Sequence, residues 1–175
     1  EMGLWPKGGQ WRIGFDDPVI AEVMARHDYP GKAVQADNVL REVRLIKSPI
    51  ELVLMARAAE ANAAALVAVG VAARAGARHC DLQSLFAQEA AKRGNAALFL
   101  NVDRVSSELS RETLRDGQAL FLDGVSSFLH YHGDFARTLF IGEPRAPAKR
   151  AAQAAAFAWN ALREQLRPGL RYSQI

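Results

Sequence analysis

Apolar residues along this chain recur at two different spacings, one typical of helices and one typical of strands. A spacing of three and four residues predicts helices over residues 49–76, 81–93 and 146–166. Between the last two of these, shorter apolar and β-rich runs predict a strand over 97–105 and two further strands, which carry Asp123 and Asp134. The sequence therefore predicts an α+β fold in which helices pack on one face of a mostly antiparallel sheet.

Local start and stop signals divide the chain into three parts. Residues 1–36 hold a short strand around 11–15 and a helix that Asp17 and Pro18 begin, which is too little to close a core, so we expect the tail of an upstream domain. Residues 37–48 are expected to form a linker. At Ser48 a capping box with Glu51 begins the helix that opens the main domain, residues 49–175, and Asp81 is expected to cap the second helix.

Composition narrows the classes of protein that remain. The chain has 175 residues, of which 50% are hydrophobic, so it can bury a core. The single Cys80 excludes an internal disulfide framework. Although the net charge is +3, arginine and lysine are scattered, so no nucleic-acid partner is expected. The apolar stretch 61–75 is too short to span a bilayer and no signal peptide pattern is present, so we expect a cytoplasmic protein with no membrane partner.

The chemistry is concentrated on the two strands with carboxylates. Asp123 ends an apolar run, and Asp134 follows eleven positions later on the next strand. Two unpaired negative charges held close together repel, and burying them costs several kcal/mol each unless a proton, a cation or a metal compensates. A divalent metal centre is the compensation that also performs chemistry.

At this level of detail the sequence resembles a known family. Asp123, Asp134, Tyr131, Arg137-Thr138 and Gly142-Glu143-Pro144 together are similar to the metal-binding core of the pita-bread metallopeptidases, the aminopeptidase P, prolidase and creatinase family. The segments 40–51 and 166–169 extend the resemblance in both directions. The resemblance implies the first half of a pita-bread catalytic domain, with Asp123 and Asp134 as ligands of two divalent ions, Mn²⁺, Zn²⁺ or Co²⁺. It also implies that a histidine and two glutamates, in a segment that would follow residue 175, complete the ligand set.

Residues near the two aspartates are assigned either to a substrate pocket or to the support of a carboxylate. Ser106 occupies the position at which the family carries a substrate-contacting histidine, so it is assigned to the substrate pocket together with His130 and His132. The alternation of side chains along a strand predicts that both histidines share a face with Asp134. Arg137 is expected to pair with a site carboxylate, and Thr138 to donate or accept a hydrogen bond beside it. No residue of this chain is assigned as the catalytic acid or base.

The resemblance implies hydrolysis of the bond N-terminal to proline by a water that two metal ions activate, with a peptide or a small amide as substrate. It also implies a homodimer. Two alternatives stay open. One is a metal-free, creatinase-like amidinohydrolase, which the retention of both carboxylates argues against. The other is a catalytically deficient pita-bread binding module, which Ser106 favours.

Overall fold

The computed structural model describes residues 12–27, 31–105 and 110–174. The chain forms two compact units, Glu1–Pro49 and Ile50–Ile175. In the first unit β1 (Arg12–Phe15) pairs in parallel with β2 (Lys32–Gln35), and two helices accompany them, α1 (Pro18–Arg26) and α2 (Asp37–Leu45). The predicted cap of α1 is confirmed, because the Asp17 carboxylate accepts a hydrogen bond from the Val19 backbone N–H at 2.9 Å. Helix α2 occupies most of the segment that we expected to be a linker.

The second unit opens with two helices. Helix α3 (Pro49–Ala72) begins where the sequence predicts and ends four residues earlier, and α4 follows over His79–Lys92. The prediction that Asp81 caps α4 is wrong. The N-cap is Arg78, and Asp81 lies in the first turn, where its carboxylate accepts hydrogen bonds of 2.8 and 2.7 Å from the Arg78 guanidinium. The first backbone N–H groups of α4 donate instead to carbonyls of the loop at 110–112, so no side-chain cap is needed.

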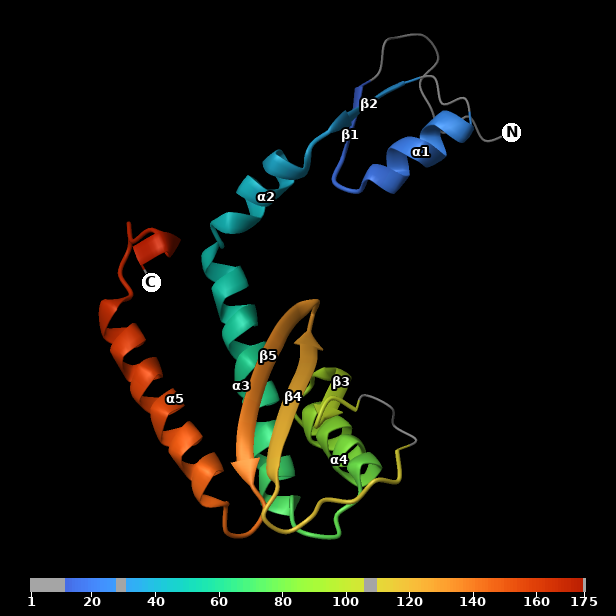
Figure 1. Ribbon diagram of the computed structural model, residues 1–175. Helices are drawn as coiled ribbons and strands as arrows, with labels where there is room; N and C mark the ends of the chain where they lie inside the picture. The colour runs from blue at the N-terminus through green and yellow to red at the C-terminus, as the bar shows by residue number, and fades with distance from the viewer. Residues whose placement is uncertain (1–11, 28–30, 106–109, 175) are drawn as a thin grey trace. The chain divides into compact units, whose positions relative to one another are not determined.

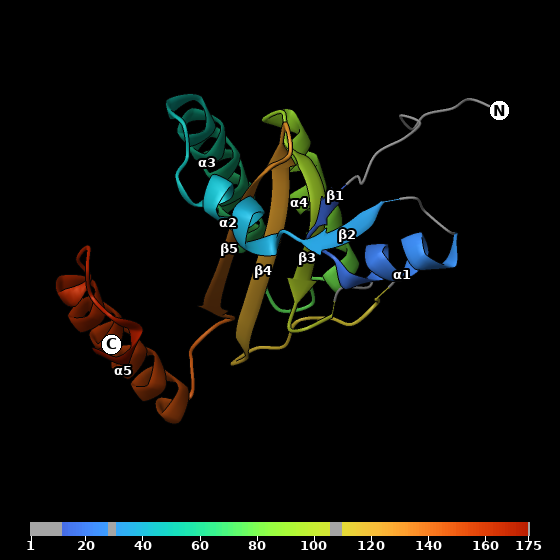
Figure 2. The ribbon, with the colours of Figure 1, turned by 90° about the horizontal axis from the view of Figure 1, so that it is seen from above.

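The sheet of the second unit has three antiparallel strands in the order β3-β4-β5, which lie side by side in Figure 2. They are β3 (Ala96–Val102), β4 (Ala119–Phe128) and β5 (Tyr131–Phe140). A two-residue turn joins β4 to β5, and both of its residues, Leu129 and His130, have positive φ angles of 47° and 69°. Positive φ at both central residues is the geometry that matches the right-handed twist of a hairpin.

Helices α3 and α4 cover one face of this sheet, and α3 runs behind the β4–β5 hairpin in Figure 1. Alternate strand residues such as Leu120 and Leu122 are buried against Leu66 and Phe86 of the two helices. Gln83 of α4 adds two hydrogen bonds from its side-chain amide to backbone carbonyls, of Leu100 at 3.0 Å and Val105 at 3.2 Å. Neither helix covers the other face of the sheet. The predicted α+β arrangement of helices on an antiparallel sheet is therefore confirmed.

Two helices leave much apolar surface exposed. Helix α5 (Ala146–Gln165) lies within one residue of its predicted range, and its Phe157 and Trp159 side chains are 78% and 56% exposed. Helix α3 has 24 residues and is long and apolar enough to cross a membrane, judged by length and composition only. The stretch 61–75, from which no membrane span was expected, covers only part of this apolar region. One face of α3, which includes Ala58, Asn62 and Leu66, is buried in the core of this unit. Core helices of globular proteins have the same length and composition.

An ion-pair cluster at the end of α4 predicts an acid-sensitive contribution to stability. Hydrogen bonds from Lys92 and then Arg93 hold the pKa of the Glu89 carboxyl below its ordinary value. A depressed pKa in the folded state stabilises the fold above the unfolded-state pKa, and this contribution is lost as the pH falls through the folded-state pKa. We expect Glu89→Gln to unfold with a weaker pH dependence than the wild type below about pH 4.3. Thermal unfolding at stepped pH checks this, and parallel curves for both proteins would contradict it.

Candidate metal centre

The register of the hairpin places the two predicted metal ligands on the same face of the sheet. Asp123 lies opposite Ala136, and Asp134 lies opposite Val125. Because directly opposed residues and residues two apart share a face, Asp123 and Asp134 are diagonal neighbours. Such neighbours lie about 7–8 Å apart across an antiparallel pair, within reach of two side chains that converge on bound ions. This is the face that α3 and α4 leave open.

The two carboxylates differ in their surroundings. Asp134 is exposed, whereas Asp123 is half-buried and accepts a hydrogen bond of 3.2 Å from the side-chain amide of Asn101 on β3. Asn101 lies directly opposite Asp123 in the β3–β4 pair. In the part of the chain that the structure describes, neither Asp123 nor Asp134 forms an ion pair with a cationic side chain. The negative charge of this pair is therefore not compensated within the described chain.

Asn101 is a site residue that our sequence interpretation missed. A signal for it exists, because it is the one polar side chain in the apolar run Leu98–Val102. A polar residue within a predicted strand that borders a carboxylate strand is a candidate partner for that carboxylate. The amide can donate to one Asp123 oxygen and leave the other oxygen available, which fixes the direction of the carboxylate.

Of the predicted neighbours on β5, Thr138 and His132 share the open face with Asp134. Thr138 lies opposite Phe121, and His132 lies opposite Ser127, on the far side of Asp134 from Asp123. His130 does not share that face as a strand residue, so this expectation is wrong. It occupies the exposed second position of the turn, because the hairpin closes between Phe128 and Tyr131. The assignment of His130 and His132 to a substrate pocket stays a prediction.

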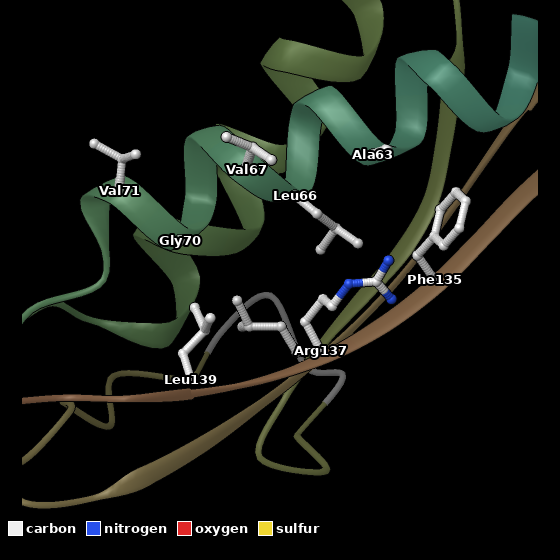
Figure 3. Close-up of a pocket in the computed structure, with 9 residues that line it drawn as sticks. Ala63, Leu66, Val67, Gly70, Val71, Phe135, Arg137 and Leu139 are labelled. Carbon is white, nitrogen blue, oxygen red and sulfur yellow. The ribbon is translucent and has the colours of Figure 1, made fainter. Parts of the chain in front are cut away.

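The expected ion pair of Arg137 is wrong as well. Arg137 lies opposite Leu122 and therefore on the helix side of the sheet, away from the face that carries Asp123 and Asp134. Figure 3 shows its side chain beside Phe135, and the guanidinium carbon is 5.2 Å from the centre of that ring. The physical reason is the alternation of side chains, since Arg137 is three positions from Asp134 and an odd separation puts two strand residues on opposite faces.

Arg137 borders an apolar groove of about 410 Å³ between α3 and β5. Its lining includes Ala63, Leu66 and Gly70 from α3 and Leu139 from β5 (Figure 3). This groove lies on the opposite side of the sheet from the carboxylates. It therefore does not hold a substrate of any reaction that takes place at Asp123 and Asp134.

Ser106, the third residue assigned to a substrate pocket, lies outside the described residues. Its role stays a prediction.

Tyr131 anchors the turn end of the hairpin to α3. Its hydroxyl donates a hydrogen bond of 3.1 Å to the carboxylate of Glu51, in the first turn of that helix. Burial, and then the nearby Glu51 carboxylate, raise the pKa of the Tyr131 hydroxyl. The tyrosine thus stays protonated as a donor through the neutral range, and it holds the helix and the hairpin together on the side away from the carboxylates.

The donor set on the open face fits divalent metal ions in part. Carboxylate oxygens suit hard divalent ions, and an uncompensated pair of them on one face attracts such ions. Among the described residues no group of three or more His, Cys, Asp or Glu side chains could hold a metal ion together. Asp123 and Asp134 therefore fit as two ligands of a larger set.

Solved structures with the same fold share an activity class in their names. A prolidase from Thermococcus sibiricus aligns with a TM-score of 0.76 and 17% identity, over 95% of this chain and 48% of that one. The dipeptidase PepE from Mycobacterium ulcerans aligns at 0.71 and 21%, over 83% and 42%. The proline aminopeptidase P II from Yersinia pestis aligns at 0.67 and 22%, over 84% and 39%. The chain has the pita-bread fold of these proteins and spans less than half of their length.

The model of metallopeptidase family M24 matches residues 53–175, which is most of the chain. This protein belongs to metallopeptidase family M24, and the predicted family resemblance is confirmed. No curated protein sequence matches it.

Proposed function

We propose that this chain supplies the first two carboxylate ligands of a peptidase site that cleaves the bond N-terminal to proline. One observation carries the proposal. Asp123 and Asp134 share the open face of the β4–β5 hairpin without a cationic partner among the described residues, in a chain of metallopeptidase family M24. The specificity for proline is supported by the prolidase and aminopeptidase P names of the structures with this fold.

Each residue has a distinct task in this proposal. Asp123 and Asp134 hold divalent ions, Mn²⁺, Zn²⁺ or Co²⁺, between them. Asn101 orients Asp123 through its 3.2 Å hydrogen bond, and Thr138 offers a hydroxyl on the same face. Bound ions would polarise the peptide carbonyl and acidify a water that attacks it. His132, which extends the same face beyond Asp134, and Ser106 would contact the substrate.

The rest of the site lies outside the described residues in this proposal. A histidine and two glutamates would complete the ligand set, and a glutamate among them would carry the proton from the attacking water. A peptide or small amide substrate, a homodimer and a cytoplasmic location belong to the same proposal.

A second candidate function is a pita-bread binding module without turnover. The observation that favours it is Ser106, which stands at the position where the family carries a substrate-contacting histidine. In that case the open face of the sheet would bind a partner rather than ions. The two candidates make opposite predictions for metal binding.

A direct Mn²⁺ titration followed by electron paramagnetic resonance separates these candidates, because free and bound Mn²⁺ give different spectra. The peptidase proposal expects binding that saturates, and hydrolysis of an Xaa-Pro dipeptide or of an Xaa-Pro-Xaa peptide in the presence of Mn²⁺, with an Ala-Ala peptide as the control substrate. Mn²⁺ binding without hydrolysis would leave only the ligand assignment in place. Absence of both would favour the binding module.

The position of Arg137 predicts a variant that spares the carboxylate pair. Arg137→Met keeps an unbranched side chain, about as long as the aliphatic part of arginine, and removes its charge. Because Arg137 lies on the helix side of the sheet, we expect the Mn²⁺ affinity to change by less than about twofold, far below the 10–100-fold cost typical of residues that support a metal ligand. The same titration measures it. A loss of tenfold or more would place Arg137 beside the carboxylates after all.

A further inference from the structure

A buried polar network lies directly behind the carboxylate pair, on the helix side of the sheet. The side-chain amide of Asn62 on α3 donates a hydrogen bond of 2.9 Å to the backbone carbonyl of Gly124. The Ser126 hydroxyl donates to the Asn62 carbonyl oxygen at 2.7 Å, and Asn95 donates to Ser126 at 2.9 Å. Asn62 and Ser126 are fully buried, with 0% of each residue exposed. A buried amide that makes two hydrogen bonds has one orientation available to it.

Asn62 acts on the residue next to a candidate ligand. Gly124 follows Asp123 in β4, and the two side-chain positions point to opposite faces of the sheet. A hydrogen bond to the Gly124 carbonyl therefore fixes the peptide plane one residue after Asp123. Asp123 projects to the open face from this part of the backbone.

Helix α3 also presses against the backbone behind the second carboxylate. A Cβ atom added at Gly133 would lie 2.6 Å from Cβ of Asn62 and closer still to the carbonyl oxygen of Ala58. Gly133 precedes Asp134 and lies directly opposite Ser126. The same turn of α3 thus contacts the chain beside both candidate ligands, and Asn62 takes part in both contacts.

We propose that Asn62 is a positioning residue for the Asp123–Asp134 pair: it sets the separation and direction of the two carboxylates by holding the backbone of both strands from behind the sheet. This inference deepens the proposed function, on which it rests for its metal readout. Its structural part, the control of the backbone at residues 123–125 by Asn62, stands independently of any metal.

The test compares two buried amides of one network. Asn62→Ala removes the hydrogen bond to Gly124. Asn95→Ala removes bonds to Ser126 and to the Ala58 carbonyl, and it leaves the bond between Asn62 and Gly124 in place. Both variants lose a buried, hydrogen-bonded asparagine, so both are expected to lower the melting temperature. Mn²⁺ affinity is then measured by titration, and amide chemical shifts and hydrogen exchange at residues 122–126 and 133–135 by nuclear magnetic resonance without metal.

We expect Asn62→Ala to weaken Mn²⁺ binding by about 10–100-fold, and Asn95→Ala to weaken it by less than about threefold at similar loss of stability. Without metal, Asn62→Ala should shift the amide signals and speed the exchange of residues 123–125 and 134. Equal effects of the two variants on Mn²⁺ affinity, or unchanged amide signals at those residues in Asn62→Ala, would overturn the proposal.

Failure of the proposed function has a different signature. If the wild type binds no Mn²⁺, the ligand assignment fails, and the amide measurements alone decide the role of Asn62. If Asn62→Ala does not fold, Ser126→Ala takes its place, since it removes the hydroxyl that orients the Asn62 amide while the amide itself remains. The expected result is then a smaller loss of affinity, with the same residues affected in the amide spectrum, and no change in either would overturn the proposal.

Discussion

Asp123→Asn is expected to weaken Mn²⁺ binding by more than about 100-fold, because residues that only support a ligand typically cost 10–100-fold and Asp123 is proposed as a ligand itself. The substitution keeps the shape of the side chain and removes one negative charge. It also removes one of two like charges on neighbouring strands and keeps an oxygen that can accept from Asn101, so the metal-free protein should lose no stability. Titration with Mn²⁺ and thermal unfolding without metal measure the two effects.

A loss of affinity without a loss of stability separates a lost ligand from a damaged fold. Glu60→Gln is the matched control, since Glu60 is an exposed carboxylate on α3 and far in sequence from the hairpin. It should change neither the affinity nor the melting temperature beyond error. An Asp123→Asn protein that binds Mn²⁺ as tightly as the wild type would remove Asp123 from the site.

Gly133→Ala is expected to destabilise the second unit by about 3 kcal/mol, the upper end of the usual cost of overpacking a core. The added methyl group would overlap the carbonyl oxygen of Ala58 and the Cβ of Asn62. The first is a backbone atom of α3, and the second is bonded directly to the backbone of that helix. Neither can rotate away, so the helix and the hairpin must separate. Denaturant unfolding measures the loss.

Gly70→Ala provides the contrast on the same interface. Its added Cβ would lie 3.3 Å from a terminal methyl group of Leu139, which can move, and alanine gains about 1 kcal/mol over glycine in a helix interior. We therefore expect Gly70→Ala to be neutral or stabilising. Equal losses for the two variants would show that the close approach at Gly133 does not limit the packing.

Much of the fold follows from the sequence because the strongest patterns were local. The helical spacing over 146–166 predicted α5 to within one residue, and Asp17 with Pro18 predicted the start of α1. The cap of α4 failed for a tertiary reason. The carbonyls of Ser110 and Glu112, about thirty residues further along the chain, accept hydrogen bonds from the N–H groups of Cys80 and His79, so the helix begins before Asp81 and leaves it in the first turn.

The candidate site was predicted less completely. The two aspartates follow from their place on adjacent strands, but the faces of their neighbours depend on where the hairpin turns. Placing the turn at Leu129–His130 moves His130 out of the strand, and counting from Asp134 puts Arg137 on the helix side. Asn62 acts across a contact that joins distant parts of the chain, and no local spacing in the sequence indicates it. Asn101 stands out in the sequence as a polar residue within an apolar strand, but its partner Asp123 is set by the pairing of β3 with β4.

No catalytic or binding role is assigned to the tight turn at Leu129–His130, yet this turn determines on which face of the sheet the two carboxylates lie. It fixes the pairing of β4 with β5, and with that pairing Asp123 and Asp134 face away from the helices while Gly124 and Gly133 face toward them. A slip of β5 by one residue would turn its whole set of side chains over, so that Asp134 would meet the backbone of α3 and Gly133 the solvent. Because only glycine fits against α3 at position 133, the slipped pairing is sterically excluded. The close contact between α3 and Gly133 therefore keeps Asp134 on the open face of the sheet.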